Sequence, residues 1–418
     1  MSKTFWVPID RPDVTVNSLR VSCWSSALLR AQRATFTNSD HQLRRPDRSS
    51  IMNSRPHSTS MRRRFVVAVG LVTLLSGTLG INATSASAHT PSISYRYTDL
   101  NAAQVPAGYL FNDFTAGLDS ADRVYGTSYA VDSAGDAVPN VSEYAHGTTT
   151  ILQRRPSVAH VVNALGVVGG SVLTNVAQST EQAALFLGDH ADVIPRQPGE
   201  ISSFVVALNN LGVAIVLSSD GSHTTYFRCW LHHTTRLDFG PDVTDPDVTG
   251  INDAGFVTGI DQTSPQEAFR YDPYTGASTL LPPQPTESNS WGLGINDRSD
   301  VLGYSFNFNS TERIGVWDAR GHFHTYIVEG TPQVPTISNS LRFNDDNQII
   351  VTFVSNSAPD YGTSYLIPRP GVRLNLANLV ENPPTNVGAF GDVTAENDRG
   401  SLVGFGLDGT DFLLERQG

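Results

Sequence analysis

Acidic residues recur at predicted turns and are the first candidates for chemistry. Asn252-Asp253, Asn296-Asp297 and Asn344-Asp345-Asp346 place carboxylates at turn tips. Calcium would need six or more oxygen ligands converging on one ion. An Asn or Asp side chain that bonds its own backbone two residues on explains the same residues at every occurrence. We therefore interpret these residues as turn formers and predict no metal site and no cofactor.

Histidine, cysteine and serine patterns give little support for catalysis. His322 and His324 fall on one face of a predicted strand and could hold zinc, but spacing places no third ligand beside them. Cys229 lies between Arg228 and Trp230 without a Cys–His signature and is most simply a small packed residue. A nucleophile elbow of the G-x-S-x-G type is absent from the sequence. We predict no catalytic residue.

The acidic turns belong to a repeat that occurs seven times. Its first Asx residue, called position 0 below, is Asp119, Asn163, Asn209, Asn252, Asn296, Asn344 and Asn397, with spacings of 44, 46, 43, 44, 48 and 53 residues. Position −1 is apolar in six units and is Glu396 in the last. An apolar residue, an Asx turn and a β-branched run closed by Gly predict strand, tight turn and strand.

Two further positions fit this hairpin. Position +3 carries Gly166, Gly212, Gly255 and Gly400, with Asp122, Ser299 and Asn347 in the other units. Gly, Asn and Asp suit the left-handed backbone that such a turn needs, so Ser299 is the weakest copy. Position +7 is Gly in five units and Val216 or Val351 in two. Glycine within a strand indicates close backbone approach or a bend.

Each repeat also has a second hairpin. Glu267–Asp272 leads through a Pro-Tyr-Thr-Gly turn into Ala277–Leu281, and Ile314–Asp318 leads in the same way into His322–Tyr326. Two hairpins make four strands in about 45 residues, which is the size of a propeller blade. Helical arrays are excluded because these segments alternate with a period of two residues and are rich in Val, Thr, Tyr and Gly. The sequence predicts an all-β, seven-bladed β-propeller with four-stranded antiparallel blades.

The N-terminal segment predicts export. Met61-Arg62-Arg63-Arg64, the apolar run 65–75 and Ala86-Ser87-Ala88 have the order of a secretory signal peptide, and the run is too short for a membrane anchor. We therefore expect translation to start at Met61 or Met52 rather than Met1, with 1–60 a disordered gene-model extension. Residues 61–88 are the predicted signal peptide, and 89–418 form the propeller, secreted by an exporting bacterium without a membrane anchor after cleavage.

The net charge of the predicted mature chain excludes some classes of binding partner. Residues 89–418 contain 16 Lys+Arg and 36 Asp+Glu, a net charge of −20, and the sequence has no Lys beyond Lys3. Such an acidic surface argues against nucleic acid and anionic membranes as partners. Cys229 is alone in 89–418, so no intramolecular disulfide is expected there. Nothing in the composition requires an oligomer, and we expect a monomer.

The last repeat is one strand short, whereas a strand pattern at 92–100 precedes the first repeat. We predict that 95–100 forms the outermost strand of blade seven and so closes the ring, which leaves no unpaired blade interface. The alternative is an unattached leader after the cleavage site.

The repeated pattern resembles the extracellular HAF-repeat family. Gly250–Gly276 and Gly294–Gly321 match it best, and the resemblance covers most of 110–418. The family's namesake triplet reads Glu267-Ala268-Phe269, Ala183-Ala184-Leu185 and Ile314-Gly315-Val316, so its His is absent. The resemblance implies secretion and a β-propeller-like array, and it implies no agreed activity.

Binding is the favoured function. Position −5 carries Phe114, Val158, Phe204, Asp247, Trp291, Asn339 and Asp392 on the predicted innermost strands. We predict Phe114, Phe204, Asp247, Trp291 and Asp392 as ligand-binding residues, because aromatic faces and carboxylates around one ring suit a sugar or a peptide. Packing of Phe114, Val158, Phe204 and Trp291 between blades is the alternative reading. The predicted function is non-enzymatic recognition of an extracellular glycan or protein, and the alternative is a propeller hydrolase or lyase acting on an extracellular polysaccharide.

Overall fold

The computed structural model describes residues 93–102, 105–133, 135–175, 180–231, 233–307, 312–329, 336–354, 363–383, 390–406 and 409–417. All of them belong to the compact unit formed by 85–418. The predicted extension 1–60 and signal peptide 61–88 lie outside the described residues. Within the described ranges, no helix has the length and apolar character needed to cross a bilayer.

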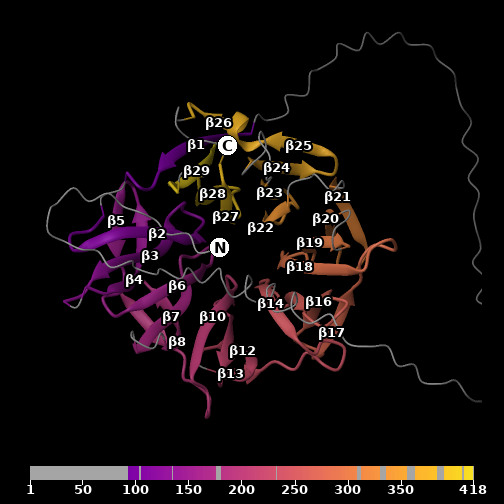
Figure 1. Ribbon diagram of the computed structural model, residues 1–418, viewed down its shortest axis with the longest axis horizontal. Coiled ribbons are helices and arrows are strands. Elements are labelled where there is room, and N and C mark those ends of the chain that lie inside the picture. The colour runs from indigo at the N-terminus through magenta and orange to yellow at the C-terminus, as the bar shows by residue number, and fades with distance from the viewer. Residues whose placement is uncertain are drawn as a thin grey trace, which may run out of the picture. The chain divides into compact units, whose positions relative to one another are not determined.

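Seven antiparallel sheets surround one central axis, which confirms the predicted seven-bladed β-propeller (Figure 1). Blade one consists of β2 (Tyr109–Leu118), β3 (Val124–Val131), β4 (Ala137–Ala145) and β5 (Thr148–Ile151). Blade two consists of β6 (Ser157–Val162), β7 (Val168–Asn175), β8 (Thr180–Leu187) and β9 (His190–Val193). Blade three consists of β10 (Ser202–Leu208), β11 (Ala214–Ser219), β12 (Thr224–Trp230) and β13 (His233–Arg236).

Blades four to six follow the same plan. Blade four consists of β14 (Pro246–Ile251), β15 (Val257–Asp261), β16 (Glu267–Asp272) and β17 (Ala277–Leu281). Blade five consists of β18 (Asn289–Ile295), β19 (Val301–Phe306), β20 (Glu312–Trp317) and β21 (Phe323–Glu329). Blade six consists of β22 (Thr336–Phe343), β23 (Ile349–Val354), β24 (Thr363–Arg369) and β25 (Val372–Asn375).

Blade seven joins the two ends of the described chain. β27 (Asp392–Glu396), β28 (Leu402–Phe405) and β29 (Asp411–Gln417) are followed by β1 (Ser94–Asp99), which pairs antiparallel with β29. Closure by the N-terminal strand is therefore confirmed. One detail differs, because the chain leaving the 3₁₀ helix η1 (Leu376–Leu379) adds a two-residue strand, β26 (Val380–Glu381), parallel to β1. The outermost strand is thus β26, and β1 is the fourth of five.

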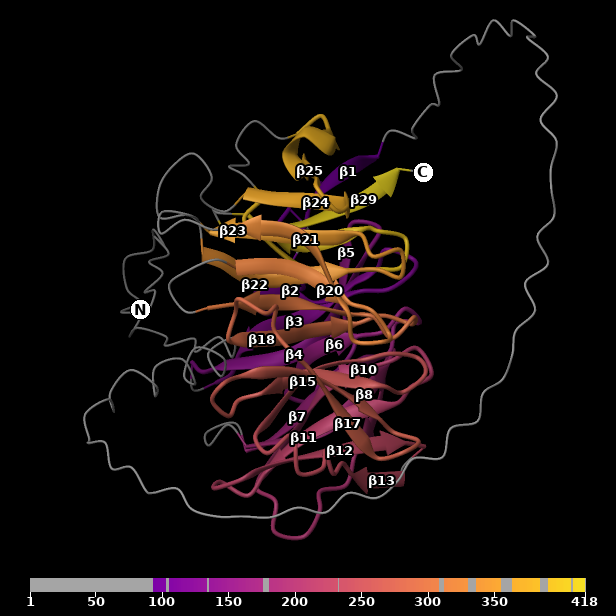
Figure 2. The ribbon, with the colours of Figure 1, turned by 90° about the vertical axis from the view of Figure 1, so that its right-hand side faces the viewer.

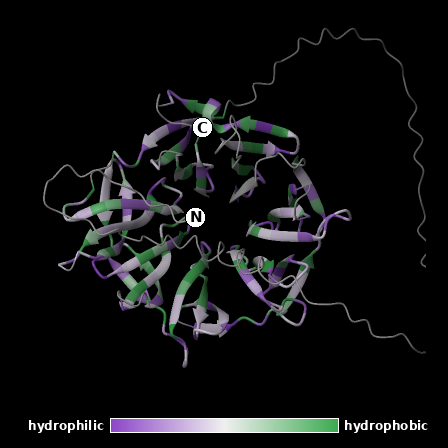
Figure 3. Cartoon of the chain, viewed as in Figure 1, coloured by the Kyte–Doolittle hydropathy of each residue, from purple (hydrophilic) through white to green (hydrophobic). Residues whose placement is uncertain are grey.

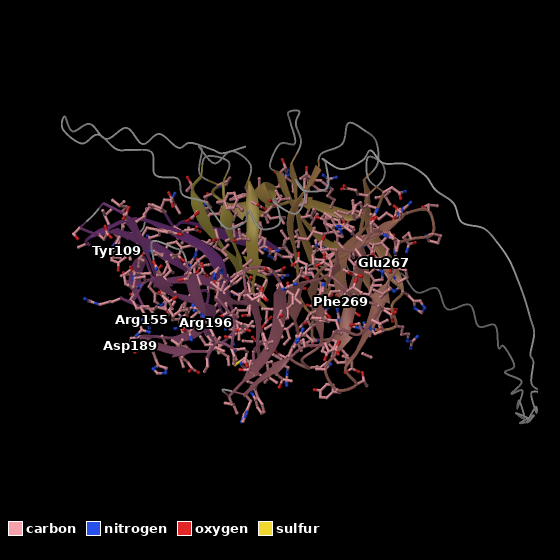
Figure 4. The ribbon with its side chains drawn as sticks, turned by 60° about the horizontal axis from the view of Figure 1, so that its bottom comes forward. Tyr109, Arg155, Asp189, Arg196, Glu267 and Phe269 are labelled. Atoms are coloured by element: carbon pink, nitrogen blue, oxygen red, sulfur yellow. The ribbon has the colours of Figure 1, made fainter. Side chains whose placement is uncertain are left out.

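The core lies between blades rather than within any one of them. The strands run roughly along the ring axis, so the face of one sheet meets the face of the next (Figure 2). Hydrophobic residues concentrate on the strands, whereas hydrophilic residues colour many of the connecting turns (Figure 3). Phe269 on β16, for example, is fully buried and contacts Phe239 from the preceding blade linker edge-on, at 5.3 Å between ring centroids (Figure 4).

The glycine at position +7 marks a close approach of two backbones. In five blades the innermost strand bulges two to four residues before the Asx position, as between Val248 and Gly250. The irregular stretch is longer in blade one, between Asp113 and Gly117, and in blade six, between Ile337 and Leu341. A Cβ on Gly259 would lie 2.1 Å from the carbonyl oxygen of Asp247, so no larger residue fits this backbone. The prediction of close approach is confirmed at this position.

The Asx turns have the predicted geometry. In blade two, Asn163 Oδ1 accepts hydrogen bonds from the N–H groups of Leu165 (3.1 Å) and Val167 (3.0 Å). Position +3 has positive φ in all seven turns, including Ser299 at 62°. The weakest sequence copy therefore adopts the same left-handed backbone as the glycines.

The position-0 side chains also connect the blades, which the turn motif alone does not predict. Each Asn Nδ2 points to the following turn and donates a hydrogen bond there. The acceptors are Asn209 O for Asn163, Asn252 O for Asn209, Asn296 O for Asn252, Asn347 Oδ1 for Asn296, Glu396 Oε1 for Asn344 and Asp119 O for Asn397, at 2.8–3.1 Å. At Asp119, which has no amide to donate, Ser120 N–H bonds Ala164 O at 3.0 Å. We call this circle the amide ring.

Replacing Asn252 with Ala should destabilise the propeller by about 1–3 kcal/mol, because it orphans buried partners in two turns. Phe256 N–H would lose its side-chain acceptor and Asn296 O its donor. The measurement is chemical denaturation, with Asp272→Ala as the matched control. Asp272 accepts from Tyr274 N–H within its own outer turn, so its loss should cost less. Equal losses in the two variants would contradict an inter-blade role for Asn252.

Candidate functional site

The Asx turns surround an open cavity of about 170 Å³ at one mouth of the central channel. Residues at positions −1, 0 and +1 line it, so the same three repeat positions build its wall from successive blades. Because each innermost strand ends at this mouth, the repeat places equivalent side chains at equivalent depths. The result is two layers of different chemistry.

The outer layer is acidic. Asp253, Asp297, Asp345 and Asp398 occupy position +1 in blades four to seven, and we call them the acidic arc. Each of the first three accepts a hydrogen bond from the backbone N–H of the preceding turn. The pairs are Asn210 N to Asp253 Oδ1 at 2.7 Å, Asp253 N to Asp297 Oδ1 at 2.8 Å and Asp297 N to Asp345 Oδ1 at 2.9 Å. These bonds fix the carboxylates around the mouth.

The charges of the acidic arc act on one another across the mouth. Burial raises the pKa of Asp297, and the carboxylates of Asp253, Asp345 and Asp398 raise it further. Burial also raises the pKa of Asp398, with Asp345 and Asp253 adding to the effect. Asp398 and Asp253 lie in blades seven and four, so carboxylates from separate blades converge on one volume. A concave surface lined by a single sign of charge concentrates the opposite charge.

The inner layer is apolar with one exception. Its members at position −1 are Leu118, Val162, Leu208, Ile251, Ile295 and Phe343, which we call the apolar throat. Glu396 takes this position in blade seven. Glu396 Oε1 accepts from Asn344 Nδ2 at 3.1 Å, whereas Oε2 is buried and finds no hydrogen-bond partner in the described part of the chain. Burial raises the pKa of Glu396 to about 8, although Arg416 and the Asn344 bond lower it.

The two layers together suit an organic cation. The described residues contain no group of three His, Cys, Asp or Glu side chains arranged to hold one metal ion. An ammonium or guanidinium group with an aliphatic stem is larger than a bare ion and combines charge with apolar surface. Its head would meet the acidic arc, and its stem would meet the apolar throat.

The predicted ligand residues lie at the other end of the innermost strands. Phe114 is 1 % exposed and packs edge-on against Tyr144 at 5.9 Å between ring centroids. Phe204 is half-buried beside His160 of the neighbouring blade, at 5.1 Å. Asp392 is half-buried on β27 and acts electrostatically on the buried Arg342. The Phe114 contact thus lies within blade one, that of Phe204 joins blades two and three, and Asp392 acts across the boundary of blades six and seven.

Asp247 and Trp291 are brought into one network. Gln262 Nε2 donates to Asp247 Oδ2 at 3.4 Å, Gln266 Nε2 donates to Gln262 Oε1 at 2.7 Å, and Trp291 Nε1 donates to Gln266 Oε1 at 2.9 Å. The two glutamines were not singled out in the sequence. Ligand binding by Phe114, Phe204, Asp247, Trp291 and Asp392 stays a prediction.

From the sequence, the acidic turn tips are interpreted as turn formers rather than calcium ligands. Neither the acidic arc nor Glu396 is predicted there as part of a site. Two signals were present in the sequence: position +1 is Asp in four consecutive repeats, and Glu396 is the one acid at an otherwise apolar position. Their meaning depends on ring closure, which brings repeats far apart in the chain to the same mouth.

Stability should fall as pH rises from about 4.5 to 8.5, since several buried carboxyls have raised pKa values. Burial raises the pKa of Asp411 to about 7, with Asp113 adding to the effect, and that of Glu396 is about 8. A folded pKa above the unfolded value favours the folded state below the unfolded pKa, and this contribution disappears as pH passes the folded pKa.

Glu396→Gln should therefore reduce the fall in melting temperature between about pH 6 and 8 relative to the wild type. Melting curves at a series of pH values, at constant ionic strength, measure both slopes. A wild-type melting temperature that rises over this range would contradict the assignment.

Among known proteins, similarity to this chain is found only in solved structures. No family model matches the chain, and no curated protein matches it. The β-propeller domain of the Trilobed protease from Pyrococcus furiosus is similar at 8 % identity, covering 78 % of this chain and 97 % of that one, with a TM-score of 0.47. YCF48 bound to D1 peptide is similar at 11 % identity, covering 77 % and 94 %, with a TM-score of 0.41. TolB from Acinetobacter baumannii is similar at 11 % identity, covering 73 % and 66 %, with a TM-score of 0.38.

Proposed function

We propose that this propeller is a binding module that recognises a basic segment of a partner protein at the mouth formed by its Asx turns. The observation that carries the proposal is the acidic arc standing over the apolar throat. Negative charge alone would not distinguish this cavity from any other acidic surface. Here the carboxylates converge on a cavity that the apolar residues of position −1 also line, and Glu396, whose buried Oε2 has no hydrogen-bond partner among the described residues, occupies that same repeat position.

The hydrogen bonds of the acidic arc favour recognition over turnover. Asp253, Asp297 and Asp345 each hold a backbone N–H of a neighbouring turn through one oxygen. Carboxylates fixed in this way present charge without first having to be ordered, which lowers the cost of binding. Among the two ligand classes expected from the sequence, a protein fits better than a neutral glycan, because the mouth selects for positive charge.

We also propose that the module works outside the cell and belongs with the extracellular HAF-repeat proteins. Support comes from the signal-peptide pattern of 61–88, the repeat motif and the net charge of −20 in 89–418. Expression of 61–418 in a secreting bacterial host should release a protein that begins at His89, as N-terminal sequencing would show. Retention of the full chain inside the cells would contradict this part of the proposal.

Binding of a hexalysine peptide, followed by isothermal titration calorimetry, tests the site. The wild-type protein should bind it with an affinity that falls as sodium chloride is added. The double variant Asp297→Asn, Asp345→Asn should bind about tenfold more weakly. Its fold should persist, since Asn210 at the same repeat position already accepts the N–H of Ala164 through Oδ1 at 2.8 Å.

The matched control is Asp136→Asn, Asp220→Asn. These two exposed aspartates occupy turns at the opposite end of the strands, so their removal changes the net charge equally and should leave hexalysine affinity unchanged. Equal affinity of the wild type and the Asp297, Asp345 variant would overturn the proposed function. Release of reducing sugars from an extracellular polysaccharide by the wild type, lost in that variant, would instead establish the enzymatic alternative.

A further inference from the structure

Blades two and three expose large apolar side chains in, or next to, the turns at the same end of the strands as the acidic mouth. Leu165, Leu211 and Leu231 are 65 %, 65 % and 68 % exposed, and Leu187 and Trp230 are also exposed. We call these five residues the apolar rim. Single exposed leucines are common on proteins, whereas five large apolar residues in or next to the turns of two adjacent blades form a candidate contact surface.

The fold does not need leucine at these positions. Leu165 and Leu211 occupy position +2, where the other five turns carry Ala121, Ala254, Arg298, Asp346 and Arg399 in the same Asx geometry. Leu231 has a φ of 47°, a left-handed backbone that bulky residues seldom adopt. The corresponding outer turns use Gly188, Gly276, Gly321 and Gly371 at positive φ. Leucine at position 231 therefore carries strain without a packing role.

The apolar rim and the acidic arc share one face of the ring. In an antiparallel blade, the first–second and third–fourth connections lie at the same end of the strands. The turns holding Leu165 and Leu211 are in contact, because Ala164 N–H donates to Asn210 Oδ1 at 2.8 Å. The next bond, from Asn210 N–H to Asp253 Oδ1, connects this side directly to the acidic arc. One face thus carries leucines at position +2 on blades two and three and carboxylates at position +1 on blades four to seven, with the exposed Arg298 and Arg399 following two of these carboxylates.

We propose that the partner segment is amphipathic, with basic side chains for the acidic arc and apolar side chains that cover Leu165 and Leu211. This inference rests on the proposed function and specifies its ligand. A second copy of this chain is a poor occupant, because the same face of two copies would bring one acidic arc toward another. A basic segment with alternating apolar residues is complementary to both halves.

Two peptides of equal length and charge separate the two contributions. The first alternates Lys and Leu over six residues, and the second alternates Lys and Ser. The wild type should bind the Lys-Leu peptide about tenfold or more tightly than the Lys-Ser peptide. Leu165→Ser, Leu211→Ser should remove most of this preference while keeping the affinity for the Lys-Ser peptide. The control Leu110→Ser, Ile201→Ser alters exposed residues at the opposite end of the strands and should keep the preference.

Each outcome decides the inference. Equal binding of both peptides by the wild type, or a preference that survives in the Leu165, Leu211 variant, would overturn it and leave the proposed function intact. Failure of both peptides to bind would overturn the proposed function and the inference with it. Sedimentation velocity covers the remaining case: a dimer of the wild type that the Leu165, Leu211 variant loses would assign the apolar rim to self-association instead.

Discussion

The propeller depends on a contact between neighbours that no blade can make alone. Each blade is a four- or five-stranded sheet whose two faces need covering, and the apolar clusters between blades provide the bulk of that cover. Apolar contact is non-directional, however, and sets neither the register nor the distance between blades. The amide ring supplies that direction at the channel mouth, since every Asn side chain shapes its own turn through Oδ1 and reaches the next turn through Nδ2. An asparagine is suited to both duties, because a carboxylate cannot donate and a hydroxyl is too short to do both.

The same geometry explains how a site arises from a structural repeat. In blades three to six the side chain after the Asn accepts a backbone N–H of the preceding turn, and Asn210 does this as well as Asp253. Charge at that position is therefore free to vary without loss of the fold. Position +2 is freer still, because alanine, leucine, arginine and aspartate all occur there. The turns thus hold fixed residues that keep the ring together beside variable residues that give the face its chemistry.

Much of the architecture could be predicted from the sequence because its determinants are local. The Asx turn, the left-handed residue at position +3 and the glycine at position +7 each follow from interactions within a single hairpin, and even Ser299 conforms. Closure of the ring by the N-terminal strand could be predicted because the last repeat lacks one strand and an additional strand precedes the first repeat. The pairing of Val380 with Tyr95 could not be predicted, since a two-residue parallel strand has no sequence signature. The convergence of Asp253 and Asp398 depends on the curvature of the whole ring, so local patterns indicated a turn there and not a site.

Closure by β1 also has a consequence for biosynthesis. Tyr95 pairs with Arg416, and Leu100 N–H bonds Asp411 O at 2.9 Å, so β1 finds its antiparallel partner in a strand that is synthesised after the other six blades. Contacts of such long sequence range delay completion of folding. The seventh sheet therefore cannot assemble until β29 has been synthesised, whereas the strands of the other six blades are contiguous in the sequence. Blade seven is thus the one sheet of the described ring whose hydrogen bonds require both ends of that ring to be present.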